Sequence, residues 1–171
     1  HLVANVGSGR SIPGFQVGEA EWNRVLDLNF RSAVTLIETA LPLLMERSGA
    51  TITAIGSIAG LEALGAPLAY SSAKAALAAY CGALAREIGP RGVRANYIAP
   101  GNILFPGGTW DAKLKLDRGA VERYIASEVP LNRFGSPEEI ADIAVFLSSG
   151  RATFVTGACI IVDGGQTRKF M

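Results

Sequence analysis

The stretch ATITAIGSIAGLEALGAPLAYSSAKAALAAYCGALAREIGPRGVRANYIAP, residues 50–100, holds two strand-like runs with one long helical pattern between them. ATITAIG (50–56) and VRANYIAP (93–100) are short apolar runs that stop at Gly or Pro, as buried strands do. YSSAKAALAAYCGALAREI (70–88) has the length of a helix, and GPRG ends it. Because parallel neighbours need a crossover connection, this order predicts a parallel sheet covered by helices.

The flanking sequence continues the same alternation of strand-like and helical patterns. HLVANVG (1–7) is a further short apolar run, and a long helical pattern follows over residues 19–47. Near the other end, Ser136 is an expected N-cap with Pro137 at the first helical position and Glu139 completing a capping box. The remaining expectations are a structureless loop over 101–118, a helical piece over 119–127, a helix over 136–149 and a last strand in ACIIVDGG, 158–165. The fold class is therefore α/β.

Composition limits the kind of protein. The chain has 171 residues, 49% of them hydrophobic, and a formal net charge of +1, which is typical of one globular domain. Gly, Pro or charged residues interrupt every apolar run before the ~20 residues that a membrane span needs, and the first residues lack the pattern of a signal peptide. With no run of Lys or Arg, we expect a cytoplasmic protein that binds neither membrane nor nucleic acid.

The cysteines and the single histidine exclude several kinds of site. Cys81 and Cys159 lie far apart without CxxC spacing, so we expect buried small hydrophobes rather than a disulfide or redox pair. His1 stands at the end of the chain, where a fixed catalytic role is not expected. These residues therefore predict neither a histidine-based triad nor a metal site.

In a parallel α/β sheet, ligands bind at the carboxyl ends of the strands. The residues just after the predicted strands are therefore the first candidates for a site. In chain order they are Asn5, Gly7, Ser57, Pro100 and Gly101.

Tyr70 and Lys74 begin the helix that follows Ser57, and they share a helix face because they are four residues apart. One interpretation is structural, with a half-buried tyrosine and a solvated lysine. The other is chemical: a nearby ammonium favours the ionised phenol and tunes it toward acid–base work. The spacing of these two residues alone leaves both interpretations open.

Further residues at fixed spacing join this pair. Ser57 stands thirteen residues before Tyr70, Asn29 stands twenty-eight before Ser57, and Asn5 stands twenty-four before Asn29. With these spacings, the chain resembles the short-chain dehydrogenases/reductases of the short single-domain type over essentially its whole length. The stretches that carry the resemblance are VANVG (3–7), IGSIAG (55–60), APGNI (99–103), LNRFGSPEEIADIAVFLSS (131–149) and TGACIIVDGG (156–165).

The resemblance implies a Rossmann-like, doubly wound parallel sheet in three layers. The family's first strand, its TGxxxGxG turn and the residue that selects NAD or NADP have no counterpart here, and His1 corresponds to a position inside the fourth strand. Residues 1–171 are therefore expected to be the C-terminal two-thirds of a single domain that lacks the N-terminal strands and helices. We expect this chain alone to aggregate and to bind neither dinucleotide, and the choice between NAD and NADP is not readable.

By resemblance, the protein is an NAD(P)-dependent oxidoreductase that moves a hydride between nicotinamide and a carbonyl or secondary alcohol of a small molecule. Tyr70 would exchange the proton with the substrate oxygen, and Ser57 would hydrogen-bond that oxygen. Lys74 would lower the pKa of Tyr70 and hold the nicotinamide ribose. Asn29 would support a water chain, and a local disruption of the helix around this Asn fits that purpose.

The resemblance also implies the residues that hold the cofactor. Asn5 and Gly7 would line the adenosine-ribose side and Ile103 the nicotinamide side, together with Tyr70, Lys74, Pro100 and Gly101. The family's carboxamide-binding Thr is replaced by Phe105, which puts that contact in doubt. Phe105 and Trp110 form either an apolar wall for the substrate or loop aromatics that only pack. We expect 101–118 to be a mobile lid.

The long helices predict self-association. The patterns at 19–47 and 70–88 carry apolar residues on more than one face, which predicts a homodimer or homotetramer. The residues that suggest this on the second helix are Ala76, Leu77, Ala79, Tyr80 and Leu84. Two alternatives stay open: a truncated, inactive fragment that acts only through helix-mediated association, and a sugar-nucleotide epimerase or dehydratase, against which SPEEIA and VDGG speak.

Overall fold

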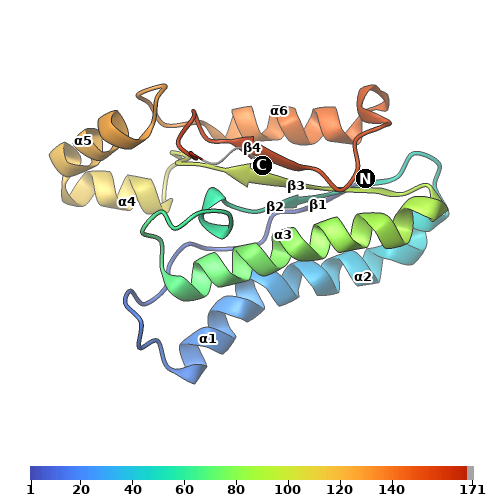
Figure 1. Cartoon of the computed structure of the whole chain (residues 1–171), viewed down its shortest axis with the longest axis horizontal. Coiled ribbons are helices and arrows are strands. Elements are labelled where there is room, and N and C mark those ends of the chain that lie inside the picture. Colours follow the sequence, from blue (N-terminus) through green and yellow to red (C-terminus); the bar gives the residue numbers. More distant parts are fainter. Residues whose placement is uncertain (169–171) are drawn as a thin grey trace.

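The computed structural model describes residues 1–168, and these fold around one parallel sheet between helical layers (Figure 1). The α/β class predicted from the sequence is confirmed. Within the described residues the sheet has four strands in the order β1-β2-β3-β4. Their bounds are Leu2–Ala4 for β1, Thr51–Ile55 for β2, Arg94–Pro100 for β3 and Cys159–Val162 for β4.

Helices cover both faces of the sheet and one of its ends. Figure 1 shows α1, α2 and α3 on one face, α6 on the other, and α4 with α5 beyond one end of the strands. The α-helices span Glu19–Leu26 (α1), Ser32–Met45 (α2), Leu68–Ile88 (α3), Thr109–Leu116 (α4), Arg118–Glu128 (α5) and Pro137–Ser148 (α6).

The central strand β3 explains the layering, because its side chains alternate between two cores. Tyr97 lies in the core that contains Leu77 of α3, whereas Ile98 packs in the core that contains Ile140 of α6. Leu77 and Ile98 are fully buried. Burying a side chain of this size contributes about 1.5–3 kcal/mol.

The register of the strands brings their carboxyl ends to one edge of the sheet. Ala4 pairs with Ala54, Ile55 with Ile98, and Pro100 with Val162, all in parallel ladders. The segments that leave β1, β2, β3 and β4 therefore start beside one another. This is the edge at which a site is expected.

The expectation of a structureless loop over 101–118 is wrong. Thr109–Leu116 forms α4, and α5 begins at Arg118. An ion pair between Lys115 and Asp111 at 2.8 Å stabilises α4, and the Asp111 carboxylate also accepts the Gly107 N–H at 2.9 Å. The glycines and proline that suggested a loop lie before the helix.

Other predicted boundaries are close to the observed ones. The helix expected from residue 70 begins two residues earlier, at Leu68. The capping box is confirmed: the Glu139 N–H donates to Ser136 Oγ at 3.4 Å, and the Ser136 N–H donates to Glu139 Oε2 at 2.9 Å. The helical pattern predicted over 19–47 is divided into α1 and α2 by a π-helical segment, Asp27–Arg31.

The cysteines are both free, but only Cys81 is buried as expected, because Cys159 lies exposed on β4. Within residues 1–168, no group of His, Cys, Asp and Glu side chains is arranged to hold a metal ion. No helix in the described part of the chain is long and apolar enough to cross a membrane.

Candidate active site

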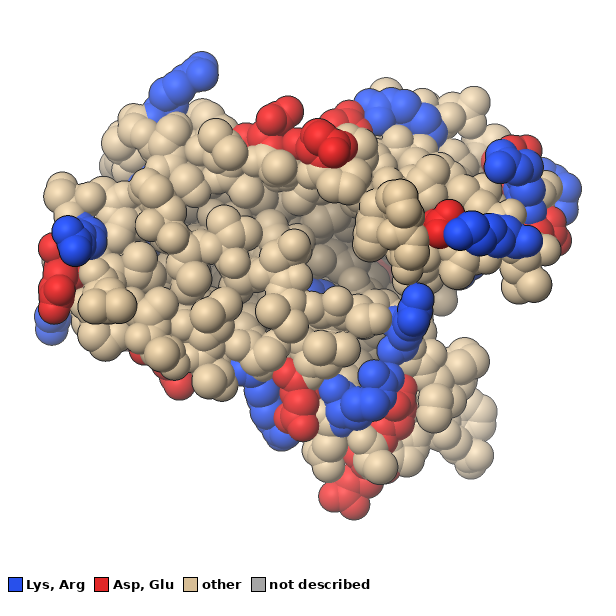
Figure 2. Space-filling model, turned by 180° about the vertical axis from the view of Figure 1, so that it is seen from behind, with Lys and Arg blue, Asp and Glu red and all other residues tan. Residues whose placement is uncertain are grey.

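A cavity of about 750 Å³ opens at the carboxyl edge of the sheet, between the strand ends and the α4–α5 pair. Figure 2 shows the molecule hollowed on this side, with mostly uncharged residues around the hollow. Pro100 and Asn29 do not line the cavity: Pro100 is buried at the end of β3, and Asn29 is completely buried. The predicted residues that do line it are Asn5, Gly7, Ser57, Tyr70, Lys74, Gly101 and Ile103.

Asn29 lies at the centre of the π-helical segment, so the predicted disruption of the helix is confirmed. Its side-chain Nδ2 donates to the Val25 carbonyl at 3.1 Å, the group that the Asn29 backbone N–H would reach in an α-helix. The Ser32 N–H donates to the Asp27 carbonyl five residues earlier. Because the side chain takes a backbone acceptor, the helix widens at this point.

The chain that leaves β1 passes directly against Asn29 and Lys74. A Cβ on Gly7 would lie 2.8 Å from Asn29 Oδ1 and 3.0 Å from Lys74 Nζ. The next residue, Ser8, donates its N–H to Asn29 Oδ1 at 2.9 Å. Gly7 therefore lets the backbone after β1 lie directly against Asn29 and Lys74, which the side chain of a larger residue would prevent.

Ser57 follows β2 and caps the short 3-10 turn Ile58–Gly60. Its Oγ accepts the Ala59 N–H at 3.1 Å. Because that bond uses an oxygen lone pair, the Ser57 hydroxyl can form a further hydrogen bond, and Tyr70 in the cavity lining is its partner there. The turn therefore holds the Ser57 side chain at the cavity beside Tyr70.

Lys74 is buried, with 4% of its surface exposed, so its interpretation as a solvated lysine is wrong. Its Nζ donates to the Ile55 carbonyl at 3.2 Å and lies 5.9 Å from the centre of the Tyr70 ring. Burial lowers the pKa of Lys74 to about 8. An ammonium group has three N–H donors, so the remaining ones can serve a ligand in the cavity.

The pKa of Tyr70 is shifted in the opposite direction to the one expected from the sequence. Burial raises the pKa of Tyr70, and a hydrogen bond with Ser57 offsets only part of that rise. Removing the phenol from water disfavours its charged form more than the neighbouring groups favour it. Tyr70 is therefore protonated at neutral pH and can donate its proton.

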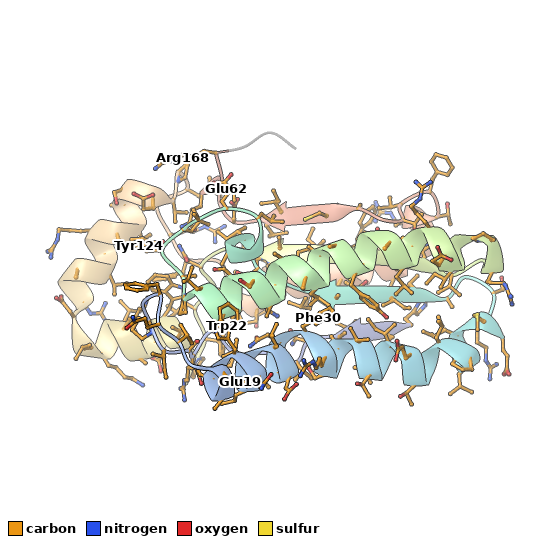
Figure 3. All side chains as sticks on the ribbon, turned by 60° about the horizontal axis from the view of Figure 1, so that its bottom comes forward. Glu19, Trp22, Phe30, Glu62, Tyr124 and Arg168 are labelled. Carbon is orange, nitrogen blue, oxygen red and sulfur yellow. The ribbon has the colours of Figure 1, made fainter. Side chains whose placement is uncertain are left out.

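A polar network on the far wall of the cavity was not predicted. Gln166 is 3% exposed; its Nε2 donates to Tyr124 Oη at 2.9 Å, and its Oε1 accepts from Asn102 Nδ2 at 2.8 Å. Figure 3 labels Tyr124, which comes from α5. Gln166 directly follows the two glycines after the last strand, so the strand-end rule could have found it.

Phe105 and Trp110 both line the cavity. Trp110 also stacks on Tyr124, with ring centres 5.3 Å apart, and lies 5.5 Å from the ring of Phe134. The interpretation of Trp110 as an aromatic that only packs is therefore wrong, while its contact with a substrate stays a prediction. Trp110 forms an apolar wall, and it packs α4 onto α5.

Ile103 lines the cavity at an isolated parallel bridge with Gly135. Its neighbours pair with the segment at Gly135, through Leu104 N–H to the Gly135 carbonyl at 3.0 Å and Gly135 N–H to the Asn102 carbonyl at 3.0 Å. Within residues 1–168, no hydrogen bond joins the N–H or the carbonyl of Ile103 to another group. Both groups are therefore available to a ligand.

The family comparison agrees with this arrangement. Residues 1–167 match the family model described as Enoyl-(Acyl carrier protein) reductase. The chain belongs to the short-chain dehydrogenase/reductase family, a family of oxidoreductases. It is similar to 2-(S)-hydroxypropyl-CoM dehydrogenase 3 from Xanthobacter autotrophicus, with 35% identity over 97% of this chain and 65% of that relative.

Two solved structures extend the likeness to three dimensions. L-sorbose reductase from Gluconobacter frateurii, complexed with NADPH and L-sorbose, is 32% identical with a TM-score of 0.90, over 99% of this chain and 67% of that one. A 3-oxoacyl-[acyl-carrier protein] reductase from Brucella melitensis, with bound NAD, is 29% identical with a TM-score of 0.82, over 95% and 60%. The chain thus spans about two thirds or less of the length of these relatives.

Proposed function

We propose that the protein that carries this chain is an NAD(P)-dependent oxidoreductase acting on a carbonyl or secondary alcohol of a small molecule, with Tyr70 as the proton-transfer group. The observation that carries the proposal is the convergence of Ser57, Tyr70 and Lys74 on one cavity, each with hydrogen-bonding capacity left over. The NADPH and NAD in the similar structures support the cofactor class without a choice between the two.

The residues on the strand-end side of the cavity fit a dinucleotide. The free N–H and carbonyl of Ile103 match the two polar groups of a carboxamide. The spare donors of Lys74 match ribose hydroxyls, and Asn5 with Gly7 borders the same side. Gly101 lines the turn after β3, while Pro100 acts only by fixing where that strand ends. When bound there, the nicotinamide supplies or accepts the hydride.

The side chains supply the proton and hold the substrate oxygen. In the reducing direction, the hydroxyls of Ser57 and Tyr70 donate hydrogen bonds to the carbonyl oxygen of the substrate. As negative charge develops on that oxygen, Tyr70 transfers its proton to it. The Lys74 ammonium beside the ring stabilises the phenolate that remains. Asn29 keeps the π-helical segment open behind Gly7, where it can support a chain of waters from Lys74.

Replacing Tyr70 by Phe tests this function. Tyr70→Phe should lower kcat by about 10³-fold or more, because the group that transfers the proton is lost. Dinucleotide affinity, measured by fluorescence titration, should stay within a few-fold, because only the phenol oxygen is removed. Tyr80→Phe is the matched control, because Tyr80 lies on the same helix and packs edge-on against Phe30 at 6.2 Å, outside the cavity lining. Near-normal turnover of Tyr70→Phe would end the proposal.

We also propose that residues 1–171 form the C-terminal two-thirds of a Rossmann-like domain. Among residues 1–168, β1 pairs only with β2, so its other edge has no strand partner, and Val3 and Val6 are 45% and 46% exposed. A further parallel strand would pair with that edge, and the helices that accompany it would cover exposed apolar side chains. Intact mass of the natural protein tests this: a product of 171 residues contradicts it and would favour the inactive fragment that associates through its helices.

Homodimer or homotetramer formation through α2 and α3 is part of the same proposal. Leu36 and Leu43 on α2 are 38% and 66% exposed, and Ala79 on α3 is exposed, which leaves apolar surface for a partner. Leu77 does not contribute to that surface, because it is fully buried in the core of the sheet. Light scattering that finds only monomer at micromolar concentration would contradict it.

A further inference from the structure

Tyr97, on the central strand, reaches the backbone of both Ser57 and Lys74. Its Oη accepts the Ser57 N–H at 3.0 Å and donates to the Lys74 carbonyl at 3.1 Å. A longer contact of 3.4 Å joins the same Oη to the Ser57 carbonyl. Because Tyr97 is 1% exposed, these backbone groups are its partners in place of water.

The loop after β2 is shaped around this tyrosine and around Lys74. A Cβ on Gly56 would lie 1.8 Å from Tyr97 Cζ, so only glycine leaves room for the ring. A Cβ on Gly60 would lie 2.6 Å from the Lys74 carbonyl carbon, so the 3-10 turn rests directly on the backbone of α3. Two glycines on either side of Ser57 thus let the loop pack closely against Tyr97 and α3.

The hydrogen bonds of Tyr97 Oη join the loop after β2 to α3, and the distance between these two elements matters for the proposed chemistry. Ser57 stands at the end of β2, whereas Lys74 lies one helical turn after Tyr70 on α3. The phenol of Tyr97 is the hydrogen-bonded link between the Ser57 amide and that turn of the helix. Small displacements between reacting groups are costly in rate, because hydrogen-bond donors must already be aimed at the developing charge.

We propose that Tyr97 is a positioning residue that sets the place of the Ser57 hydroxyl relative to the Tyr70–Lys74 turn of α3, an inference that rests on the proposed function. Tyr97 does not line the cavity, so it acts through Ser57 and Lys74 rather than on the substrate. Burial also raises the pKa of Tyr97, so its proton stays on the phenol oxygen at neutral pH.

The test is a double-mutant cycle in the complete enzyme. Tyr97→Phe keeps the ring in the core but leaves the Ser57 N–H and the Lys74 carbonyl without this partner. We expect kcat for a ketone to fall about tenfold to 100-fold, because the Ser57 hydroxyl is then displaced from its place beside the Tyr70–Lys74 turn. In the Ser57→Ala background, the same change should cost less than about threefold, because the group that it positions is already gone.

A second measurement does not depend on activity. Amide hydrogen exchange of residues 55–60 should become at least about tenfold faster in Tyr97→Phe, because the Ser57 N–H loses its acceptor. The matched control is Tyr80→Phe, which removes a phenol oxygen from α3 away from Ser57 and should change neither kcat nor exchange. Dinucleotide affinity should be unchanged in both variants.

The outcomes separate this inference from the proposed function. Equal losses from Tyr97→Phe in the two backgrounds, or unchanged exchange over 55–60, would overturn the positioning role. If Ser57→Ala alone keeps full turnover, the proposed function fails, and the positioning role in catalysis fails with it.

Discussion

The two ends of the sheet bury similar polar groups but use them differently. At the amino end of β3, Arg94 donates to the Val155 carbonyl at 3.0 Å and to the Leu147 carbonyl at 2.8 Å. At the carboxyl end, the Lys74 ammonium has one hydrogen bond, to Ile55. The partly buried Arg94 thus ties several chain segments together, whereas the buried Lys74 keeps donors free beside a cavity.

The two buried asparagines extend the comparison. Asn96 donates to the Val155 carbonyl at 3.0 Å and accepts the Ala158 N–H at 3.1 Å, which joins β3 to the segment before β4. Asn29 is satisfied in the same way by Val25 and Ser8, but it stands directly behind Gly7 at the cavity. Satisfied polar groups fix the structure at both ends. At the cavity, by contrast, Ser57, Lys74 and Ile103 can form further hydrogen bonds with a ligand.

The largest effects are expected from replacing Lys74 and Arg94, one cation at each end of the sheet. Lys74→Met should lower kcat by about 10²–10⁴-fold while the fold persists, because a buried amine is exchanged for an apolar chain of similar length. Arg94→Met should leave buried carbonyls unpaired and cost about 1–3 kcal/mol of unfolding free energy. Steady-state kinetics and urea denaturation of both variants measure these effects.

A loss of activity in Arg94→Met, or full activity in Lys74→Met, would contradict the different roles of the two ends of the sheet. Activity per folded molecule of Arg94→Met should stay close to that of the unchanged enzyme, because Arg94 lies outside the cavity lining. An inactive but stable Arg94→Met, or an active Lys74→Met, would show that the two ends do not divide their roles in this way.

The folding stability of the protein should depend on pH through Lys74. Because the pKa of Lys74 falls from 10.5 to about 8 on folding, the folded state releases its proton earlier than the unfolded state. Between those values the unfolded chain binds more protons, so folding stability rises with pH. The stability of the unchanged enzyme relative to Lys74→Met should therefore increase by about 3 kcal/mol from pH 8 to pH 10.5.

Urea denaturation of both proteins across that range gives the difference, in which all other titrating groups cancel. A difference that is flat, or that falls as the pH rises, would mean that the Lys74 ammonium is not held at a cost in the folded state.

The smallest expected effect concerns the wall formed by α4. The chain has 2 tryptophans, Trp22 and Trp110, and Trp110 lines the cavity. In Trp22→Phe, fluorescence from Trp110 should change when oxidised dinucleotide and an alcohol bind, since the wall orders around them. In Trp110→Phe, the remaining signal from Trp22 should change little. Equal changes in both variants, with unaltered protease sensitivity over 101–118, would argue against a mobile wall.

The sequence predicts those helices and strands that have a clear pattern of apolar residues and a Gly or Pro at their ends. The runs at 50–56 and 93–100 are strands because they are apolar and end at Gly or Pro, and they match β2 and β3 closely. Helix α4 was missed because its eight residues show no clear helical periodicity of apolar side chains. The helix is stabilised instead by packing of Trp110 on Tyr124 and by the hydrogen bond from the Gly107 N–H to the Asp111 carboxylate.

In the candidate site too, local sequence predicts some features, whereas tertiary packing decides the others. Ser57, Tyr70 and Lys74 meet at one cavity, as spacing and resemblance predict, while their chemical roles stay predictions. The raised pKa of Tyr70 was not foreseen, because the depth of burial is a tertiary property. Gln166 was missed because only residues directly after each strand were considered, and it lies beyond β4 after a turn in which Asp163 accepts the N–H groups of Gly165 at 2.9 Å and Thr167 at 2.7 Å.

The proposed hydride transfer to a carbonyl carbon in this cavity can be followed with an isotope label. The complete enzyme is incubated with a panel of ketones and with NADPH or NADH that carries deuterium at the transferable C4 position, and the products are analysed by mass spectrometry. We predict that one ketone at least gives an alcohol with one deuterium on the carbinol carbon, and that Tyr70→Phe forms this product about 10³-fold more slowly or not at all. An alcohol without deuterium, or equal deuterium transfer by Tyr70→Phe, would contradict the proposal.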